Sequence, residues 1–317
     1  MAETLENRMV ETAARQQVMA RWIPYATLTG AVCIFSLGAI FVRFAQAEHV
    51  PSLVIGTLRY SFAAMILAPY VLANHRPELR AISHRDLGFI AVAGCAFAIA
   101  LFLFFSSLEH TTVMITNLFT NTSPLWVALA EALLLKALLD RRVWLGLILA
   151  LLGGALFSLS GMDGSIRMGP DPVGGVLLSL ASALLSTVYM ILARVVRQRV
   201  PTLVFLWITM LSGSVLLYAI VLFSHTPLLG YAIEGYLWVL IVTITGQIIG
   251  QSLMAFTLAH LPATFVSVAL LGQVIISGGL AFLIFGEQPD LVQVVAGTII
   301  LAGVVMVVTT RRAVGAR

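Results

Sequence analysis

Hydrophobic residues run along the chain in ten long segments, separated by charged residues, prolines and glycines. Each segment approaches the roughly 20 residues that a helix needs to cross the hydrocarbon core of a bilayer. Polar residues do not alternate with apolar ones, as they would in the strands of a membrane barrel. The pattern therefore predicts an all-α membrane protein with ten transmembrane helices, at 24–45, 53–73, 87–108, 112–134, 143–159, 172–193, 202–223, 236–259, 263–285 and 291–309.

The two halves of the chain resemble each other at a fixed spacing of 150 residues. This shift places Pro51-Ser-Leu-Val54 on Pro201-Thr-Leu-Val204 and His110 on His260 without a gap. Because each half has an odd number of spans, the second half starts on the opposite side of the membrane. We therefore expect two inverted five-helix repeats around a central cavity. The predicted segments are a tail at 1–21, repeats at 22–160 and 172–309, a connecting loop at 161–171 and a tail at 310–317.

Composition agrees with a membrane protein and excludes several other classes. Hydrophobic residues make up 60% of the 317 residues and charged residues only 10%, which leaves too little polar surface for a soluble globule. Cys33 and Cys95 both lie in apolar runs, so neither a disulfide framework nor a metal-binding cysteine pair is expected. We predict no metal, no cofactor and no catalytic residues. Residues 1–21 are charged and lack the apolar core of a cleavable signal peptide.

Basic residues predict the orientation of the chain. Of the 18 Lys and Arg, all but Arg43, Arg59 and Arg167 lie in the two tails or in the second, fourth and sixth loops. Since basic residues beside membrane spans are retained in the cytoplasm, both termini are predicted to be cytoplasmic. The net charge of +4 then reflects membrane topology, and we expect no nucleic-acid partner.

A carrier with inverted repeats binds its solute near the bilayer centre, where polar side chains face a cavity. Three polar pairs near span centres are related by the 150-residue shift, and further polar residues share their faces. Such residues can instead hydrogen-bond between helices, which is the better explanation for a lone Ser. Amides at this depth are costly to bury and favour a binding role. The predicted substrate-binding residues are Ser36, Asn117, Asn121, Ser123, Ser186, Tyr189, Gln247, Gln251, Ser267 and Gln273.

Besides Arg43 near the end of the first span, two charged residues lie inside predicted spans. The Arg59 guanidinium needs a carboxylate, backbone carbonyls or water, and a pair with Glu48 or Glu109 is favoured over a carboxylate of the solute. Glu131 is the one carboxylate within a span. A desolvated carboxylate is suited to proton coupling, and pairing with Lys136 is the alternative.

Several short motifs resemble the ten-span EamA-type members of the drug/metabolite transporter superfamily, which include YddG-like amino-acid exporters. They are Leu58-Arg59-Tyr60 in the second span, His260-Leu-Pro-Ala263 at the start of the ninth, Gly286-Glu287 after it, and Leu301-Ala-Gly303 in the last span. The resemblance covers about 24–309. Where the family commonly has Glu-Pro in the ninth span, this chain has Gln273-Val274.

The resemblance implies a monomeric transporter in the bacterial inner membrane that exports small metabolites, amino acids such as aromatic or neutral ones foremost, by alternating access with or without a proton. Nucleosides or purines, sugars and drug-like cations remain alternative solutes. The sequence contains neither the GxxxxGK[ST] motif of ATP-driven pumps nor the HExxH motif of membrane metalloproteases. A channel and a membrane-embedded enzyme are therefore the less favoured classes.

Overall fold

A computed structural model describes residues 2–110, 116, 119–134, 140–159, 171–273, 276 and 291–314. Every element in these ranges is a helix. The first half contains α1 (Ala2–Ala47), α2 (Ser52–Asn74), α3 (Arg76–Ala81), α4 (His84–His110), α6 (Ser123–Leu134) and α7 (Arg141–Leu159). The second half contains α8 (Pro172–Val196), α9 (Thr202–Ser224), α10 (Ile233–Val242), the π-helix η1 (Thr243–Gly250), α11 (Gln251–His260), α12 (Ala263–Leu270) and α14 (Leu291–Val314).

Length and hydropathy confirm an all-α membrane fold. Five described helical segments are long and apolar enough to cross a bilayer, and several shorter apolar helices accompany them. The long segments are Ser52–Asn74, His84–Phe104, Val173–Val196, Thr202–Ser224 and Ile233–His260. The last of them is one continuous span in which α10, η1 and α11 follow each other without a loop.

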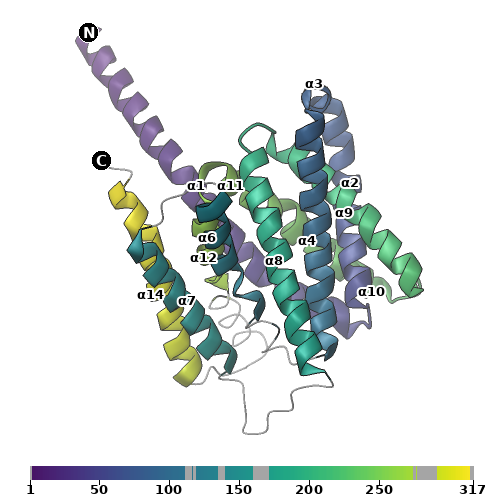
Figure 1. The fold of residues 1–317 in the computed structure, drawn as a ribbon. Coiled ribbons are helices and arrows are strands. Elements are labelled where there is room, and N and C mark those ends of the chain that lie inside the picture. The colour runs from purple at the N-terminus through teal and green to yellow at the C-terminus, as the bar shows by residue number, and fades with distance from the viewer. Residues whose placement is uncertain are drawn as a thin grey trace.

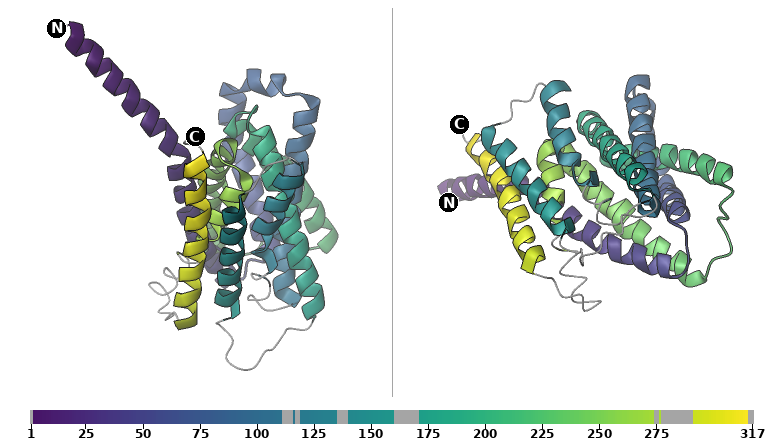
Figure 2. Two further views of the ribbon diagram at one scale, coloured as in Figure 1. Left: turned by 60° about the vertical axis from the view of Figure 1, so that its left-hand side comes forward. Right: turned by 60° about the horizontal axis from the view of Figure 1, so that its bottom comes forward.

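Helix packing follows a twofold pattern that relates the two repeats. Two helices each pack against their own counterpart, α2 against α9 and α7 against α14, and α6 packs against α12, which belongs to the counterpart span. The contact between α4 and α8 is matched by contacts of α1 with α10, η1 and α11, because that span is the counterpart of α4. Figures 1 and 2 show α7 beside α14, and Figure 1 shows α4 beside α8. The fold therefore consists of two five-helix repeats that pack face to face.

The crossing of α7 and α14 shows this symmetry at atomic distance. A Cβ atom added to Gly153 would lie 2.8 Å from the backbone nitrogen of Ile300, and one added to Gly303 would lie 2.6 Å from that of Ala150. Gly153 and Gly303, like Ala150 and Ile300, are 150 residues apart. Small residues let two membrane helices approach this closely.

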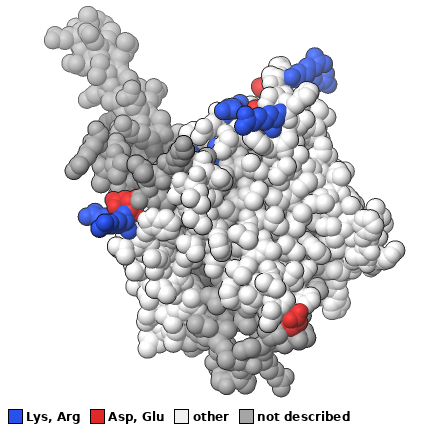
Figure 3. All heavy atoms as spheres, viewed as in Figure 1, with Lys and Arg blue, Asp and Glu red and all other residues white. Residues whose placement is uncertain are grey.

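The two ends of the bundle differ in charge. We call the end that carries α3 and the turn at Arg197–Pro201 the α3 end, and both chain termini point that way (Figure 1). On the face in Figure 3, Lys and Arg gather toward the α3 end, and uncharged atoms cover the middle. α1 begins at Ala2 and projects beyond the bundle, so residues 2–21, which were expected to form a tail, are helical. The short helix α3 lies in a segment that the hydrophobic pattern predicts to be a loop.

Candidate functional site

The fourth helix of each repeat is interrupted at an equivalent position. The first break lies directly before α6 and the second directly after α12. Each break contains a backbone hydrogen bond that spans three residues. The N–H of Thr122 donates to the carbonyl of Phe119 over 3.2 Å, and the N–H of Gly272 donates to the carbonyl of Ala269 over 3.0 Å. Donors and acceptors of these two bonds are each 150 residues apart. The repeat therefore extends to the interruptions themselves.

Local sequence explains both breaks. In the first, Pro124 has no N–H to donate and disfavours helical backbone in the residue before it. In the second, Gly272 weakens the helix because it has no side chain. Interrupted helices are tolerated at membrane depth only inside protein or beside water, and in transporters paired interruptions mark the solute site. The predicted polar pair Ser123 and Gln273 directly follows the two breaks.

Two of the predicted binding residues, Ser36 and Gln273, are in contact at the second break. The Ser36 hydroxyl on α1 donates to the carbonyl of Val32 in its own helix over 2.7 Å and to the carbonyl of Gln273 over 3.3 Å. Ser36 is 1% exposed. Its counterpart Ser186 on α8 is half-buried and forms no hydrogen bond with any described residue. The structure thus joins Ser36 to Gln273 through the Gln273 backbone.

The remaining polar candidates near the breaks have different surroundings. Asn121 is half-buried within the first break. Ser267 is buried, and its hydroxyl donates to the carbonyl of Thr264 in α12 over 2.9 Å, which satisfies it within its own helix. Asn117 lies outside the described residues.

A second polar group lies between α2, α9 and η1. The Arg59 Nη2 donates to the Gln247 Oε1 over 3.1 Å, and the Gln247 Nε2 lies 2.8 Å from the sulfur of Met210. Gln247 is 1% exposed. The predicted ion pair of Arg59 with Glu48 is absent from the structure, whereas the Glu109 side chain lies outside the described atoms. Arg59 therefore binds an amide oxygen from the second repeat.

A stacked pair of rings borders this group. The Tyr189 hydroxyl donates to the Gln251 Oε1 over 3.0 Å, and both residues are buried. The Tyr189 ring stacks on Phe97 with ring centres 4.5 Å apart. Tyr60 lies beside Arg59, Gln247 and Tyr189 and so joins the two pairs, and we call Arg59, Tyr60, Gln247, Gln251 and Tyr189 the polar cluster. Three of the predicted binding residues, Tyr189, Gln247 and Gln251, thus lie in this group and not at the breaks.

The π-helix η1 positions one side of the polar cluster. Gln247 lies within η1, close to the centre of the span Ile233–His260, and Gln251 follows at its end. π-helical turns are rare and frequently occur at functional sites. η1 and α12 both pack against α1, so the polar cluster and the second break flank the same helix.

Glu131 closes the α3 end between the two repeats. Its Oε1 accepts the backbone N–H of Ala263 over 2.7 Å, and its Oε2 accepts that of Thr264 over 3.1 Å. These are the first two residues of α12, whose N-cap residue Pro262 has no side-chain acceptor. Glu131 is 2% exposed, so it caps α12 from α6 in a buried site.

Two arginines at the end of α8 strengthen this junction. Arg194 Nη1 donates to the carbonyls of Leu258 and Leu261, and its Nε lies 4.0 Å from Glu131 Oε1. Arg197 donates to the carbonyl of Ala255 over 3.2 Å. Burial lowers the pKa of Arg197 to about 10, so it stays charged at neutral pH. We call Glu131, Arg194 and the first turn of α12 the latch. Lys136, the predicted partner of Glu131, lies outside the described residues.

Three contributors to these groups were not among the predicted site residues. Tyr60 follows Arg59 directly, and Met210 lies at a position with no polar signal. Arg194 is one residue beyond the predicted end of the sixth span, where its charge indicated topology alone. The signal that could have identified Arg194 is its place in the last turn of a helix, where a cation is favoured. The buried carboxylate that it faces belongs to the other repeat.

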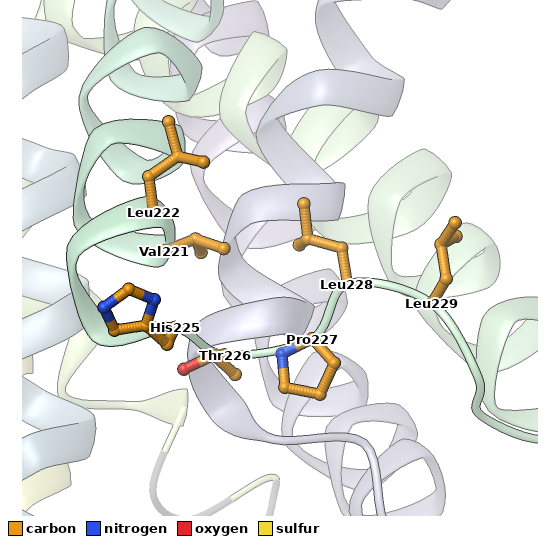
Figure 4. Close-up of a pocket in the computed structure, with 7 residues that line it drawn as sticks. All are labelled: Val221, Leu222, His225, Thr226, Pro227, Leu228 and Leu229. Atoms are coloured by element: carbon orange, nitrogen blue, oxygen red, sulfur yellow. The ribbon is translucent and has the colours of Figure 1, made fainter.

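A surface pocket of about 450 Å³ lies at the opposite end of the bundle, where α9 ends (Figure 4). Its lining residues are Val221, Leu222, His225, Thr226, Pro227, Leu228 and Leu229. None of them belongs to the breaks, the polar cluster or the latch. The pocket is therefore a feature of the loop after α9.

Paired breaks, two facing repeats and polar groups at mid-membrane define a helical membrane protein of the carrier class. The EamA-like transporter family matches the chain twice, over residues 22–159 and 173–309. The chain therefore belongs to the EamA-like transporter family and is a membrane transporter. Comparison with curated proteins gave no match.

Solved structures share the fold. Matches extend to 29 chains. One of them, described only as "Crystal structure of protein", has a TM-score of 0.78 and 20% sequence identity, and the match covers 92% of this chain and 98% of that one. At this identity the likeness supports the architecture and does not identify the solute.

Proposed function

We propose that this transporter exports small metabolites, neutral and aromatic amino acids foremost, across the bacterial inner membrane by alternating access. The single observation that supports this best is the matched pair of breaks after Thr120 and after Leu270, with polar residues beside both. Two interruptions related by the repeat give a central site that each half of the protein can uncover in turn.

In this proposal the α3 end faces the cytoplasm. Its arginines and the short basic helix α3 satisfy the rule that positive residues are retained inside. Residues 24–309 then form the monomeric carrier, with both tails inside. The latch joins α6 to α12 at this end. In this proposal the route of the solute to the cytoplasm is therefore closed in this conformation.

Counterflow into proteoliposomes tests the proposal. Purified protein is reconstituted with an unlabelled amino acid inside, and uptake of labelled leucine, phenylalanine, uridine, glucose and tetraphenylphosphonium is measured with and without a pH gradient. We expect saturable, exchange-stimulated uptake of the amino acids. Uptake of only a nucleoside, sugar or cation would replace the amino-acid assignment, and flux that does not saturate would indicate a channel.

Variants at the breaks test where the solute binds. Asn121→Ala and Gln273→Ala should raise the KM for the transported amino acid or lower its turnover, while membrane insertion stays normal. Asn117→Ala tests the predicted counterpart of Ser267 in the same way. Arg80→Gln on exposed α3 is the matched surface control. Normal KM and turnover in all three break variants would contradict a solute site at the breaks.

The same assay tests proton coupling at Glu131. Its two backbone donors and Arg194 give the carboxylate a structural task, so Glu131→Gln should leave any dependence on the pH gradient in place. Loss of that dependence with intact counterflow would assign Glu131 to proton coupling.

A further inference from the structure

The polar cluster holds a cation without a described counter-charge. Arg59 lies inside the span Ser52–Asn74, where burying a charge is costly unless it is paired. Among the described residues no carboxylate lies within ion-pair distance of Arg59, and its one hydrogen bond reaches the neutral Gln247. Burying an unpaired cation in a protein costs roughly several kcal/mol. An opposite charge is therefore the element that would balance this site.

The cluster also contains more hydrogen-bond donors than acceptors. Arg59 Nε and the Tyr60 hydroxyl are both buried, and neither has a described acceptor in hydrogen-bond geometry, although the Gln247 amide lies beside the Tyr60 hydroxyl. The Gln247 amide points its nitrogen at the sulfur of Met210, which is a weak acceptor. Its oxygen accepts from Arg59 and is the nearest acceptor for the Tyr60 hydroxyl as well. The missing component is a group that only accepts hydrogen bonds and carries negative charge, as a carboxylate does.

The repeat shows that the fold does not require this charge. A shift of 150 residues places Arg59 on Thr209 and Tyr60 on Met210, and it places Phe97 on Gln247. The counterpart positions thus bear no charge, although both repeats build the same framework. The charge of Arg59 is confined to the first repeat, and the π-helix η1 beside it is confined to the second, so both features depart from the repeat at the same place and indicate a task beyond packing.

The surroundings of Arg59 include apolar groups of the kind that contact an aliphatic or aromatic ligand. A Cβ atom added to Gly246 would lie 3.5 Å from Arg59 Nη2, so the residue beside the guanidinium is the smallest available. The stacked rings of Phe97 and Tyr189 and the Met210 side chain border the cluster. Aromatic rings and a thioether suit an aliphatic or aromatic group.

We propose that Arg59 binds the carboxylate of the transported solute, with Tyr60 and Gln247 as additional donors, so that the protein selects monocarboxylates with an apolar remainder. This inference rests on the proposed transport function and names the chemical group that the carrier recognises. During binding, the Gln247 amide turns its nitrogen from Met210 toward the carboxylate.

Ligand-induced stabilisation tests the inference without depending on transport. The protein in lipid nanodiscs is heated with L-phenylalanine or its amide, and with benzoate or benzamide, at equal concentrations. We expect both carboxylates to raise the melting temperature of the wild type and both amides to leave it unchanged. Arg59→Gln should abolish the response, whereas Arg80→Gln should keep it.

Gln247→Glu is the decisive second variant, because it places a carboxylate 3.1 Å from Arg59 without removing the arginine. We expect it to raise the melting temperature of the ligand-free protein and to weaken carboxylate binding about 10- to 150-fold, the factor that corresponds to a charged hydrogen bond of about 1.5–3 kcal/mol. A structural arginine would tolerate this internal ion pair, and ligand binding would then be unchanged.

The outcomes separate the two proposals. Carboxylate binding that requires Arg59, together with no amino-acid counterflow, would retain the anion site and reject the amino-acid assignment. Counterflow with equal KM in the wild type and Arg59→Gln would retain the transport proposal and overturn the role of Arg59. Equal stabilisation by acids and amides, or none by either, would also overturn it.

Discussion

Replacing Glu131 tests whether the latch holds the α3 end closed. In the structure its carboxylate is the cap for the first two backbone N–H groups of α12, and Arg194 adds a positive charge 4.0 Å away. Glu131→Ala removes both acceptors and leaves two buried donors beside a cation. Glu131→Gln keeps one acceptor oxygen and turns an amide N–H group toward the other donor. We therefore expect the alanine variant to be the less stable of the two.

The contacts of Glu131 determine how much unfolding free energy each variant loses. A hydrogen bond to a charged group contributes about 1.5–3 kcal/mol, and breaking a buried charged pair costs about 3–5 kcal/mol. Glu131→Ala should thus lower the free energy of unfolding by about 3–5 kcal/mol and Glu131→Gln by about 1.5–3 kcal/mol. If the latch exists only in the closed state, the same loss shifts the conformational equilibrium toward opening by about 10-fold or more.

Two measurements check this prediction. Steric trapping in bicelles gives the free energy of unfolding. Opening is measured by labelling Ser267→Cys, a position 3% exposed in α12, with a membrane-impermeant maleimide after Cys33 and Cys95 are replaced by Ala. The label should react faster in both Glu131 variants when it reaches the α3 end. Glu234→Gln at the opposite end is the exposed control and should change neither quantity.

Two outcomes would contradict a gating role for the latch. Wild-type stability and labelling in Glu131→Ala would mean that the cap contributes nothing. Lower stability with unchanged labelling would leave Glu131 as a structural cap that does not gate access.

Three further predictions concern packing, the polar cluster and the breaks. Gly153→Ala should destabilise the protein by about 1–3 kcal/mol because the added methyl group overpacks the α7–α14 crossing. The control Gly154→Ala places nothing within 4 Å of the added atom and should be neutral or stabilising by up to about 1 kcal/mol. Equal unfolding free energies in the two variants would contradict this prediction. Tyr189→Phe should cost about 1–2 kcal/mol because Gln251 loses its buried donor, and Tyr218→Phe is the exposed control for the same thermal unfolding measurement. Pro124→Ala should let helix continue through the first break, which raises thermal stability and lowers counterflow turnover; unchanged turnover would show that the break is not needed for transport.

The architecture was predictable because it depends on patterns that can be read from the sequence alone. Ten apolar runs and a constant 150-residue shift require only that buried and lipid-facing helices be apolar and that duplicated helices keep their spacing. The family match confirms the predicted resemblance and the two-repeat fold. The boundaries were less predictable: α1 extends back to Ala2 through residues that are helical without being apolar.

The site was harder to predict, because helical spacing identifies neighbours along one helix but not across two. Arg59 and Gln247 are separated by 188 residues, and no pattern in either span sets their relative height. Glu131 was recognised as unusual, yet its partners are backbone N–H groups of α12, which leave no mark in the sequence. The polar pair Ser123 and Gln273 was recognisable because the repeat itself relates its two members.

The symmetric framework carries different chemistry at its two ends. At the α3 end Arg194 binds Glu131 and two carbonyls of the second repeat, whereas its counterpart Phe44 at the opposite end contacts Trp238 with tilted rings whose centres are 4.7 Å apart. An aromatic contact has no fixed donor or acceptor to lose when it separates, but the charged latch does. In the proposed alternating-access cycle the two ends would therefore differ in the cost of opening, and a carboxylate at Arg59 would change the charge between them. The inverted repeat would supply the two conformations of that cycle, and we propose that these few unmatched residues determine which one is favoured.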